Sequence, residues 1–230
     1  MNLSSFQAVR TWVFDLDNTL YPASSALFDQ IEMKMREFVA DFLKVSQDEA
    51  DQLRASYWRD YGTTLAGLMH CNDMPPEPYM TAVHDIDFSV LHRDPALAAY
   101  ISALPGRKII YTNGSAPYAR RVLEARGLSG LFESVYGVEH ADWHPKPSRV
   151  AFETVFSKAQ FDPATAVMFE DDIRNLQVPH AMGMGTVHVA PVQADHDHIH
   201  FHTSDLTDFL SQVINQAFPN AMPDLPMAHE

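Results

Sequence analysis

Five short, nearly continuous apolar stretches constrain the fold of this chain more than any other feature of its sequence. They are rich in β-branched residues and span residues 11–15, 108–112, 134–138, 166–169 and 185–190. Strands that are apolar on both faces are typical of a parallel sheet that helices cover on both sides. Helical patterns alternate with these stretches at residues 94–104, 116–126, 148–159 and 173–182. The sequence therefore predicts an α/β fold with a doubly wound parallel sheet.

A second region interrupts this alternation between the first and second expected strands. Residues 21–91 carry apolar residues at three- and four-residue intervals, as amphipathic helices do. Within it, Ser46 with Glu49 three residues later fits the capping box of a helix. We therefore predict three parts of the chain: a core domain of residues 1–20 and 92–218, a small all-helical cap of residues 21–91, and a loose tail of residues 219–230.

Composition and charge exclude several classes of protein. Of 230 residues, 46% are hydrophobic, which is enough for a core, and no apolar run approaches the ~18 residues of a membrane span. The formal net charge of −14 argues against binding nucleic acid, which requires clustered Lys and Arg. Cys71 is the only cysteine, and the first ten residues lack the pattern of a secretory signal. We therefore expect a cytoplasmic protein with no membrane or nucleic-acid partner.

The first expected strand ends in Asp15-Leu16-Asp17, which places two carboxylates at the edge where open α/β sheets bind ligands. One such carboxylate can attack phosphorus as a nucleophile, and the other can exchange a proton with the leaving group and then with water. Two carboxylates and a phosphate would repel each other without a cation. Taken alone, the pair fits solvated loop acids equally well.

Two further motifs supply groups that suit a phosphate. Thr112 and Asn113 follow the second strand and precede Gly114, so they offer a hydroxyl and backbone N–H groups to phosphate oxygens. Lys146 lies between two prolines, and its fixed ammonium could neutralise both a phosphate and Asp15. Alone, the first motif also fits an ordinary strand-to-helix turn, and the second fits a solvated lysine.

A cluster of acids ends the fourth expected strand. Glu170, Asp171 and Asp172 would repel one another strongly without a cation, and hard carboxylate oxygens are ligands that magnesium accepts. An acid-rich helix N-terminus is the alternative interpretation of this segment. Four polar motifs thus follow expected strands, in one order along the chain.

This ordered set resembles the motifs of the haloacid dehalogenase-like hydrolase superfamily, over residues 12–191. Residues 57–68 and 83–88 of the insertion look like the cap signature of its pyrimidine 5′-nucleotidase group, as does the Asp-Leu-Asp-Asn-Thr-Leu-Tyr-Pro form of the first motif. The resemblance implies a Rossmann-like core with a cap, Mg²⁺ as cofactor, and hydrolysis of phosphate monoesters through an aspartyl phosphate.

The resemblance also assigns roles to individual residues. Asp15 would be the nucleophile and a metal ligand. Asp17 would be the general acid and base and would give its backbone carbonyl to the metal, and Asp171 would be the main acidic ligand. Four further residues would bind phosphate: Leu16, Thr112, Asn113 and Lys146. Lys146 would also pair with Asp15. Glu170 would contact the metal through a water molecule, and Asn175 would order a metal-bound water or the motif loop. The resemblance assigns no role to Asp172.

Several alternatives remain open at this point. The expected substrate is a small phosphorylated metabolite, first a pyrimidine nucleoside 5′-monophosphate and otherwise a sugar phosphate or phosphoglycolate. A phosphomutase would keep the same motifs, whereas a haloacid dehalogenase needs neither the second aspartate nor a metal. A non-catalytic nucleotide-binding regulatory protein is the rival from another class. The sequence carries no signal for oligomeric state.

Four histidines alternate between His196 and His202. On an extended segment they would share one face and could bind zinc or nickel. The alternative is a polar edge segment before a helix at residues 206–214, and we favour it.

Overall fold

A six-stranded parallel sheet organises the core of the protein, as seen in the computed structural model, which describes residues 2–223 and residue 225. The strand order is β3-β2-β1-β4-β5-β6, and every pairing is parallel. The strands are β1 (Thr11–Phe14), β2 (Arg107–Tyr111), β3 (Ser134–Tyr136), β4 (Ala166–Glu170), β5 (Gly185–Val189) and β6 (Phe201–Thr203). The predicted doubly wound parallel sheet is confirmed, and all five expected strands are present.

The sixth strand, β6, is absent from the sequence-based prediction. It is only three residues long, lies at the edge of the sheet and pairs with β5 alone. Phe201 is its one apolar residue, beside His202 and Thr203, so it lacks the nearly continuous apolar pattern of the predicted strands. This is why the residues of β6 resemble a polar edge segment when the sequence is considered alone.

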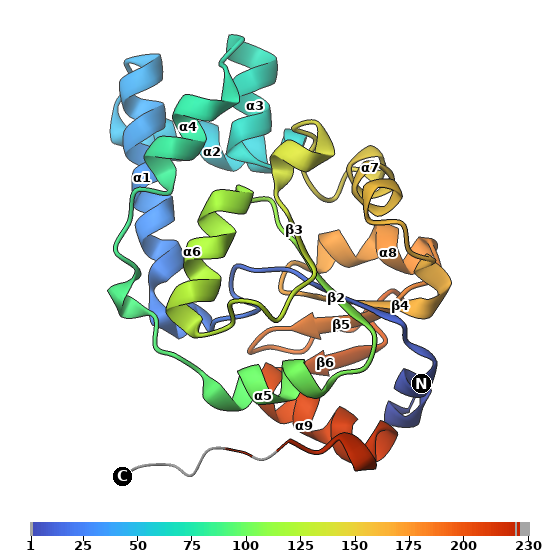
Figure 1. Ribbon diagram of the computed structural model, residues 1–230. Helices are drawn as coiled ribbons and strands as arrows, with labels where there is room; N and C mark the ends of the chain where they lie inside the picture. The colour runs from blue at the N-terminus through green and yellow to red at the C-terminus, as the bar shows by residue number, and fades with distance from the viewer. Residues whose placement is uncertain (1, 224, 226–230) are drawn as a thin grey trace.

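Helices cover both faces of the sheet (Figure 1). Successive side chains of a strand point to opposite faces, and β1 shows the consequence. Trp12 and Phe14 join the apolar cluster that contains α5, α6 and α9, whereas Val13 joins the cluster that contains α7. The helices of the core are α5 (Pro95–Ala103), α6 (Ala116–Arg126), α7 (Arg149–Ala159), α8 (Gln177–Ala181) and α9 (Leu206–Ala217).

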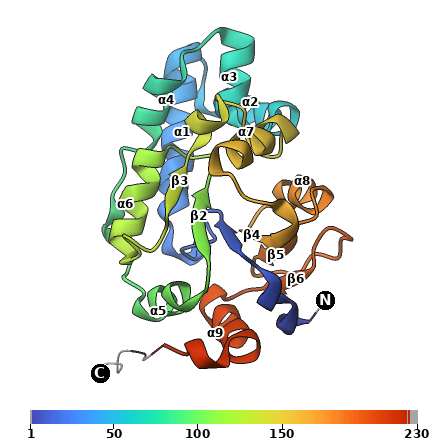
Figure 2. The ribbon, with the colours of Figure 1, turned by 45° about the vertical axis from the view of Figure 1, so that its right-hand side comes forward.

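The insertion after β1 is helical, as predicted. Its helices are α1 (Leu27–Leu43), α2 (Gln47–Tyr61), α3 (Thr64–Asn72) and α4 (Pro76–Val83). The expected capping box is present at the start of α2, where the Ser46 hydroxyl accepts from the Glu49 backbone and the Glu49 carboxylate accepts from the Ser46 backbone. Figures 1 and 2 show the four helices standing together at one end of the molecule, on the side opposite α5 and α9. The exact domain boundaries stay a prediction.

Half of the predicted tail lies outside the described part of the chain. Its first residues, Pro219–Ala221, form a single 3-10 turn that follows α9, and residues 224 and 226–230 are not among the described residues. Among those that are, no helix combines the length and the apolar character that crossing a membrane requires.

One close contact joins α2 to α3 within the insertion. Gly67 on α3 faces the Tyr57 ring on α2, and a Cβ added at Gly67 would lie 2.2 Å from the Tyr57 Cγ. The two helices approach this closely because Gly67 has no side chain. The glycine therefore sets the packing of the roof that the insertion forms over the site described below.

We predict that Gly67→Ala lowers the free energy of unfolding by about 1–3 kcal/mol, because the added methyl group overpacks the contact with Tyr57. Urea denaturation would measure it. Gly130→Ala is the matched control, because a Cβ there meets nothing within 4 Å and only its positive φ of 79° opposes the change. A Gly67→Ala protein no less stable than the Gly130→Ala protein would contradict this packing.

Candidate active site

The four sequence motifs meet at the carboxyl edge of the sheet because of the strand order. β1 lies between β2 and β4, so Asp15, Thr112 and Asp171 leave three neighbouring strands side by side. The Asp15 backbone N–H donates to the Phe169 carbonyl at 2.9 Å, which continues the β1–β4 pairing to the first acid. Lys146 reaches the same point from the loop before α7. The structure therefore brings together residues that are up to 156 positions apart in the chain, from Asp15 to Asp171.

The Lys146 ammonium lies at the centre of the site. Its Nζ donates to Asp15 Oδ1 at 2.7 Å, to Glu170 Oε2 at 2.6 Å and to the Tyr111 carbonyl at 3.1 Å. The residue is only 1% exposed. Burial alone would lower the pKa of Lys146, but the Asp15 and Glu170 carboxylates outweigh it and raise that pKa above its ordinary value. The lysine therefore stays charged and holds both acids.

Asn113 holds the loop that carries Lys146. Its Nδ2 donates to the Lys146 carbonyl at 3.1 Å, and its Oδ1 accepts from the Lys146 backbone N–H at 2.8 Å. The Asn113 side chain is therefore committed to this loop, so any phosphate contact from Asn113 falls to its backbone. Within the described chain, neither the Asn113 N–H nor the Leu16 N–H has an acceptor.

Three carboxylates form the one group of potential metal ligands found among the described residues. Asp15, Glu170 and Asp171 each offer an oxygen, and these oxygens lie within 4.8 Å of one another. Burial raises the pKa of Glu170 to about 7 and that of Asp171 to about 7, and neighbouring acids add to both effects. One lysine thus faces three acids, and hard oxygen donors with excess negative charge fit a magnesium ion.

Side-chain amides support this acid cluster. Asn18 Nδ2 donates to Asp171 Oδ2 at 3.3 Å, and Asn175 Nδ2 donates to Glu170 Oε1 at 3.2 Å. Within the described chain, the Oδ1 atoms of Asn18 and Asn175 are buried without a hydrogen-bond donor. Both asparagines line the cavity described below, so these oxygens could accept hydrogen bonds from water molecules around a bound ion.

Two tyrosines that the sequence analysis did not single out contact Asp17. The hydroxyls of Tyr21 and Tyr118 both donate to Asp17 Oδ1, each at 2.6 Å. Tyr21 lies inside the first motif, four residues after Asp17, so its helical-turn spacing offered a signal. Tyr118 lies in α6, more than a hundred residues away, and only the fold brings it to Asp17.

The four insertion helices lie over these groups and enclose with them a cavity of about 890 Å³. The insertion residues that line this cavity form its roof. Its floor includes Asp15, Asp17, Thr112, Lys146 and Asp171. The roof is largely apolar, with a few charged and polar side chains: Phe28, Ile31, Met35, Tyr79, Met80, Val83, Glu32, Asp51, Arg54, Trp58, Thr63 and Thr64. A cavity of this size suits a small organic ligand.

Asp172, to which the sequence assigned no role, connects the core to the roof. Its carboxylate binds the Arg174 guanidinium at 2.6 Å, and it caps the turn that begins at Ile173. The Arg174 guanidinium lies over the Trp58 ring of α2, 3.4 Å from the ring centroid. The acid therefore orients an arginine that makes a cation–π contact with the insertion.

The second connection of the insertion also packs on the core. The His84 ring stacks on the Tyr118 ring with centroids 4.1 Å apart and planes 6° apart, and its Nδ1 lies 3.2 Å from Ser115 Oγ. His84 is 8% exposed. Burial first, and the nearby Arg121 second, lower the pKa of His84 to about 4. The imidazole is therefore neutral near pH 7.

We predict that His84 makes the protein less stable as the pH falls. Below about pH 6.5 His84 binds a proton in the unfolded chain, whereas in the folded protein it stays neutral down to about pH 4. This residue should therefore lower the free energy of unfolding by about 2 kcal/mol between pH 7 and pH 5. Urea denaturation of wild type and His84→Asn at both pH values measures the difference. Equal pH dependence in the two proteins would refute this prediction.

The alternative in which the alternating histidines bind a metal is not supported, because no group of metal ligands found among the described residues includes them. The segment turns at Asp197 and His198 before β6 begins. His196 stacks on the His198 ring, and the other three contact different groups: His198 Nε2 the Ile173 carbonyl, His200 the Thr186 hydroxyl, and His202 the His188 ring of β5. The polar edge segment that we favoured is confirmed, and the expected helix follows it as α9.

Comparison with known proteins identifies the family. The family model for haloacid dehalogenase-like hydrolases matches residues 9–183. The chain is a member of this hydrolase family. Phosphate metabolism protein 8 of Saccharomyces cerevisiae is 26% identical to this family member over 202 residues, covering 78% of the chain and 61% of the yeast protein. The chain thus spans less than two thirds of the length of that relative.

Solved structures of the family share the fold. The Bacillus subtilis HAD-hydrolase YfnB, determined bound to magnesium, has a TM-score of 0.58 and 14% identity, covering 91% of this chain and 99% of its own. A HAD phosphatase of Thermococcus onnurineus has a TM-score of 0.60 and 16% identity, covering 90% and 99%. The L-2-haloacid dehalogenase of Xanthobacter autotrophicus has a TM-score of 0.58 and 16% identity, covering 89% and 98%. Phosphatases and dehalogenases both occur here, so the reaction must be argued from the site.

Proposed function

We propose that this hydrolase is a magnesium-dependent phosphatase that cleaves phosphate monoesters of small metabolites through an aspartyl phosphate on Asp15. The observation that carries the proposal is the buried contact of Lys146 with Asp15 and Glu170 beside Asp171. This arrangement fixes a carboxylate nucleophile among groups that neutralise phosphate charge. The name of the yeast relative, which refers to phosphate metabolism, agrees with it.

Asp15 and Asp17 divide the chemistry between them. Lys146 binds Oδ1 of Asp15, and Oδ2, which receives no hydrogen bond in the described chain, attacks phosphorus. The ester P–O bond breaks as Asp17 gives a proton to the leaving oxygen. Asp17 then takes a proton from water, which attacks phosphorus, releases phosphate and restores the Asp15 carboxylate. The backbone N–H groups of Leu16 and Asn113 and the Thr112 hydroxyl bind the phosphate oxygens. The Lys146 ammonium donates its three N–H bonds to Asp15, Glu170 and the Tyr111 carbonyl, so it stabilises the bound phosphate through its charge.

The acid cluster fits a magnesium ion. Asp15, Asp171 and the backbone carbonyl of Asp17 would hold it, while Glu170, already bonded to Lys146 and Asn175, would act through a water molecule. When bound, the ion supplies positive charge that offsets the phosphate and the carboxylates. The magnesium in the YfnB structure supports this assignment.

The reaction we propose differs from dehalogenation in its demands on the protein. A dehalogenase needs neither a second carboxylate nor a metal. In this chain, however, Asp17 lines the cavity and accepts hydrogen bonds from two tyrosines, and three other carboxylates form one cluster of potential metal ligands. Both features serve phosphoryl transfer to and from Asp15. They favour the phosphatase over the dehalogenase.

For the substrate we propose a nucleoside 5′-monophosphate, with pyrimidine bases first. The cavity of about 890 Å³ has room for a nucleoside above the phosphate site, and its apolar roof suits a base and sugar. The pyrimidine preference rests on the resemblance of residues 57–68 and 83–88 to the 5′-nucleotidase cap signature. Rates on a panel of nucleotides, sugar phosphates and phosphoglycolate test this choice, and a sugar phosphate or phosphoglycolate as best substrate would overturn it.

We predict that Asp15→Asn abolishes phosphate release, with a loss of at least about 10⁴-fold in kcat, because the amide cannot form the covalent intermediate. Released phosphate would be measured on the same panel with wild type and variant. The near-isosteric amide keeps the fold, which circular dichroism would verify. Equal activity of the two proteins would eliminate Asp15 as the nucleophile.

We predict that chelation with EDTA removes the activity and that Mg²⁺ restores it. In Asp171→Asn the concentration of magnesium for half-maximal activity should rise by about tenfold or more, since a ligand is lost. Asp172→Asn is the matched control, because Asp172 binds Arg174 and lies outside the acid cluster, so its magnesium requirement should not change. A requirement that shifts equally in both variants would exclude Asp171 as a specific ligand.

A further inference from the structure

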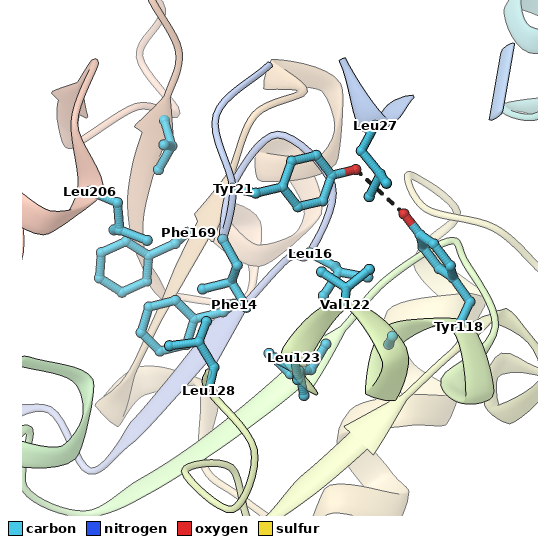
Figure 3. Packing of buried hydrophobic residues seen from close by; sticks show 14 of the residues in the cluster. Phe14, Leu16, Tyr21, Leu27, Tyr118, Val122, Leu123, Leu128, Phe169 and Leu206 are labelled. Carbon is cyan, nitrogen blue, oxygen red and sulfur yellow. Dashed lines mark hydrogen bonds between the residues drawn. The ribbon is translucent and has the colours of Figure 1, made fainter. Parts of the chain in front are cut away.

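Two tyrosine hydroxyls converge on one oxygen of Asp17. Tyr21 and Tyr118 each donate to Oδ1 at 2.6 Å. Their hydroxyl oxygens lie 3.4 Å apart, and Figure 3 shows the two hydroxyls pointing toward one another. Each tyrosine is 1% exposed. Hydrogen bonds to a carboxylate at this length are of the strong, charge-assisted kind. The pair therefore fixes the position of Oδ1.

The two oxygens of Asp17 have different surroundings as a result. Oδ1 takes both tyrosine hydroxyls, whereas Oδ2 receives no hydrogen bond within the described chain. Asp17 also lines the cavity beside Asp15. An aspartate side chain that is held by one oxygen presents the other in a defined direction. Because the two tyrosines hold Oδ1, only Oδ2 is left for proton transfer.

Burial keeps the two phenols in their donor form. Desolvation first, and the Asp17 carboxylate second, raise the pKa of Tyr21 and of Tyr118 above the ordinary value. In the structure both hydroxyls act as donors to Asp17.

Each tyrosine also lies at or beside a connection between the insertion and the core. Tyr21 is the first residue of the predicted insertion, and the Tyr118 ring of α6 stacks on His84, which follows α4 at the other connection. Asp17 is therefore linked through the two tyrosines to both connections between the sheet and the roof of the cavity. Tyr21 and Tyr118 therefore both position the insertion over the cavity and orient the Asp17 carboxylate.

We propose that Tyr21 and Tyr118 are positioning residues that hold Asp17 so that its free oxygen delivers the proton to the leaving group. The inference rests on the proposed phosphatase function and adds to it the groups that aim the acid. In the step concerned, Asp15 bonds to phosphorus, the ester P–O bond breaks, and the proton of Asp17 passes to the departing oxygen. An alkoxide leaving group needs this proton, whereas p-nitrophenolate leaves without one.

The test compares two esters in the Tyr21→Phe, Tyr118→Phe and double variants. kcat/KM is the readout because it covers only the steps up to P–O cleavage. For a nucleoside or alkyl monophosphate, the double variant should lose at least about tenfold, and at most the factor of about 10²–10⁴ that a general acid supplies. For p-nitrophenyl phosphate, kcat/KM should fall far less. Tyr100→Phe, a buried tyrosine of α5 outside the site, is the matched control.

A double-mutant cycle separates positioning from mere support of the fold. Asp17→Asn should show the same selective loss on the alkyl ester, and adding the tyrosine substitutions to it should cost nothing more. Equal loss on both esters, no loss on either, or additive losses in the Asp17→Asn background would each overturn the inference. If one single variant does not fold, the other carries the same comparison. Failure of the proposed function is distinct, because the wild type would then hydrolyse neither ester.

Discussion

The buried Lys146 ammonium is the interaction on which the rest of the site depends. It bonds to Asp15, to Glu170 and to the Tyr111 carbonyl at 1% exposure, where an unpaired charge would be very costly. Removing one member of such a buried pair typically costs about 3–5 kcal/mol. The Asn113 amide holds the Lys146 loop in place through two hydrogen bonds to the Lys146 backbone. The lysine orients Asp15. Because three carboxylates surround this one lysine, their excess negative charge favours the binding of a second cation.

This arrangement explains how a chain with a net charge of −14 can hold an anion. One of the 16 Lys and Arg residues, Lys146, is buried at the site itself. In the function we propose, Lys146 would supply part of the positive charge, the backbone N–H groups of Leu16 and Asn113 would supply more, and a magnesium ion at the acid cluster would supply the rest. The overall charge of the protein is therefore a poor guide to the charge that a substrate meets at this site.

Sequence alone predicts most of the fold and which polar residues meet at the edge of the sheet, because strands and motifs both have recognisable local sequence patterns. Apolar runs predict the inner strands, and the order of Asp15, Lys146 and Asp171 along them predicts a shared edge. The edge strand β6 is missed because Phe201 is its one apolar residue, which makes no apolar run. Tyr118 and the Arg174–Trp58 contact are missed because their partners come from distant elements, and nothing in the local sequence encodes which helix faces which loop.

The most direct test of this account is to trap the covalent intermediate. Wild-type protein turning over a nucleoside monophosphate with Mg²⁺ would be quenched and reduced with borohydride, which converts an aspartyl phosphate to homoserine, and then digested for peptide mass analysis. Our account predicts homoserine at position 15, dependent on both substrate and Mg²⁺. Phosphate release with no modification at Asp15, or with modification at another residue, would contradict it.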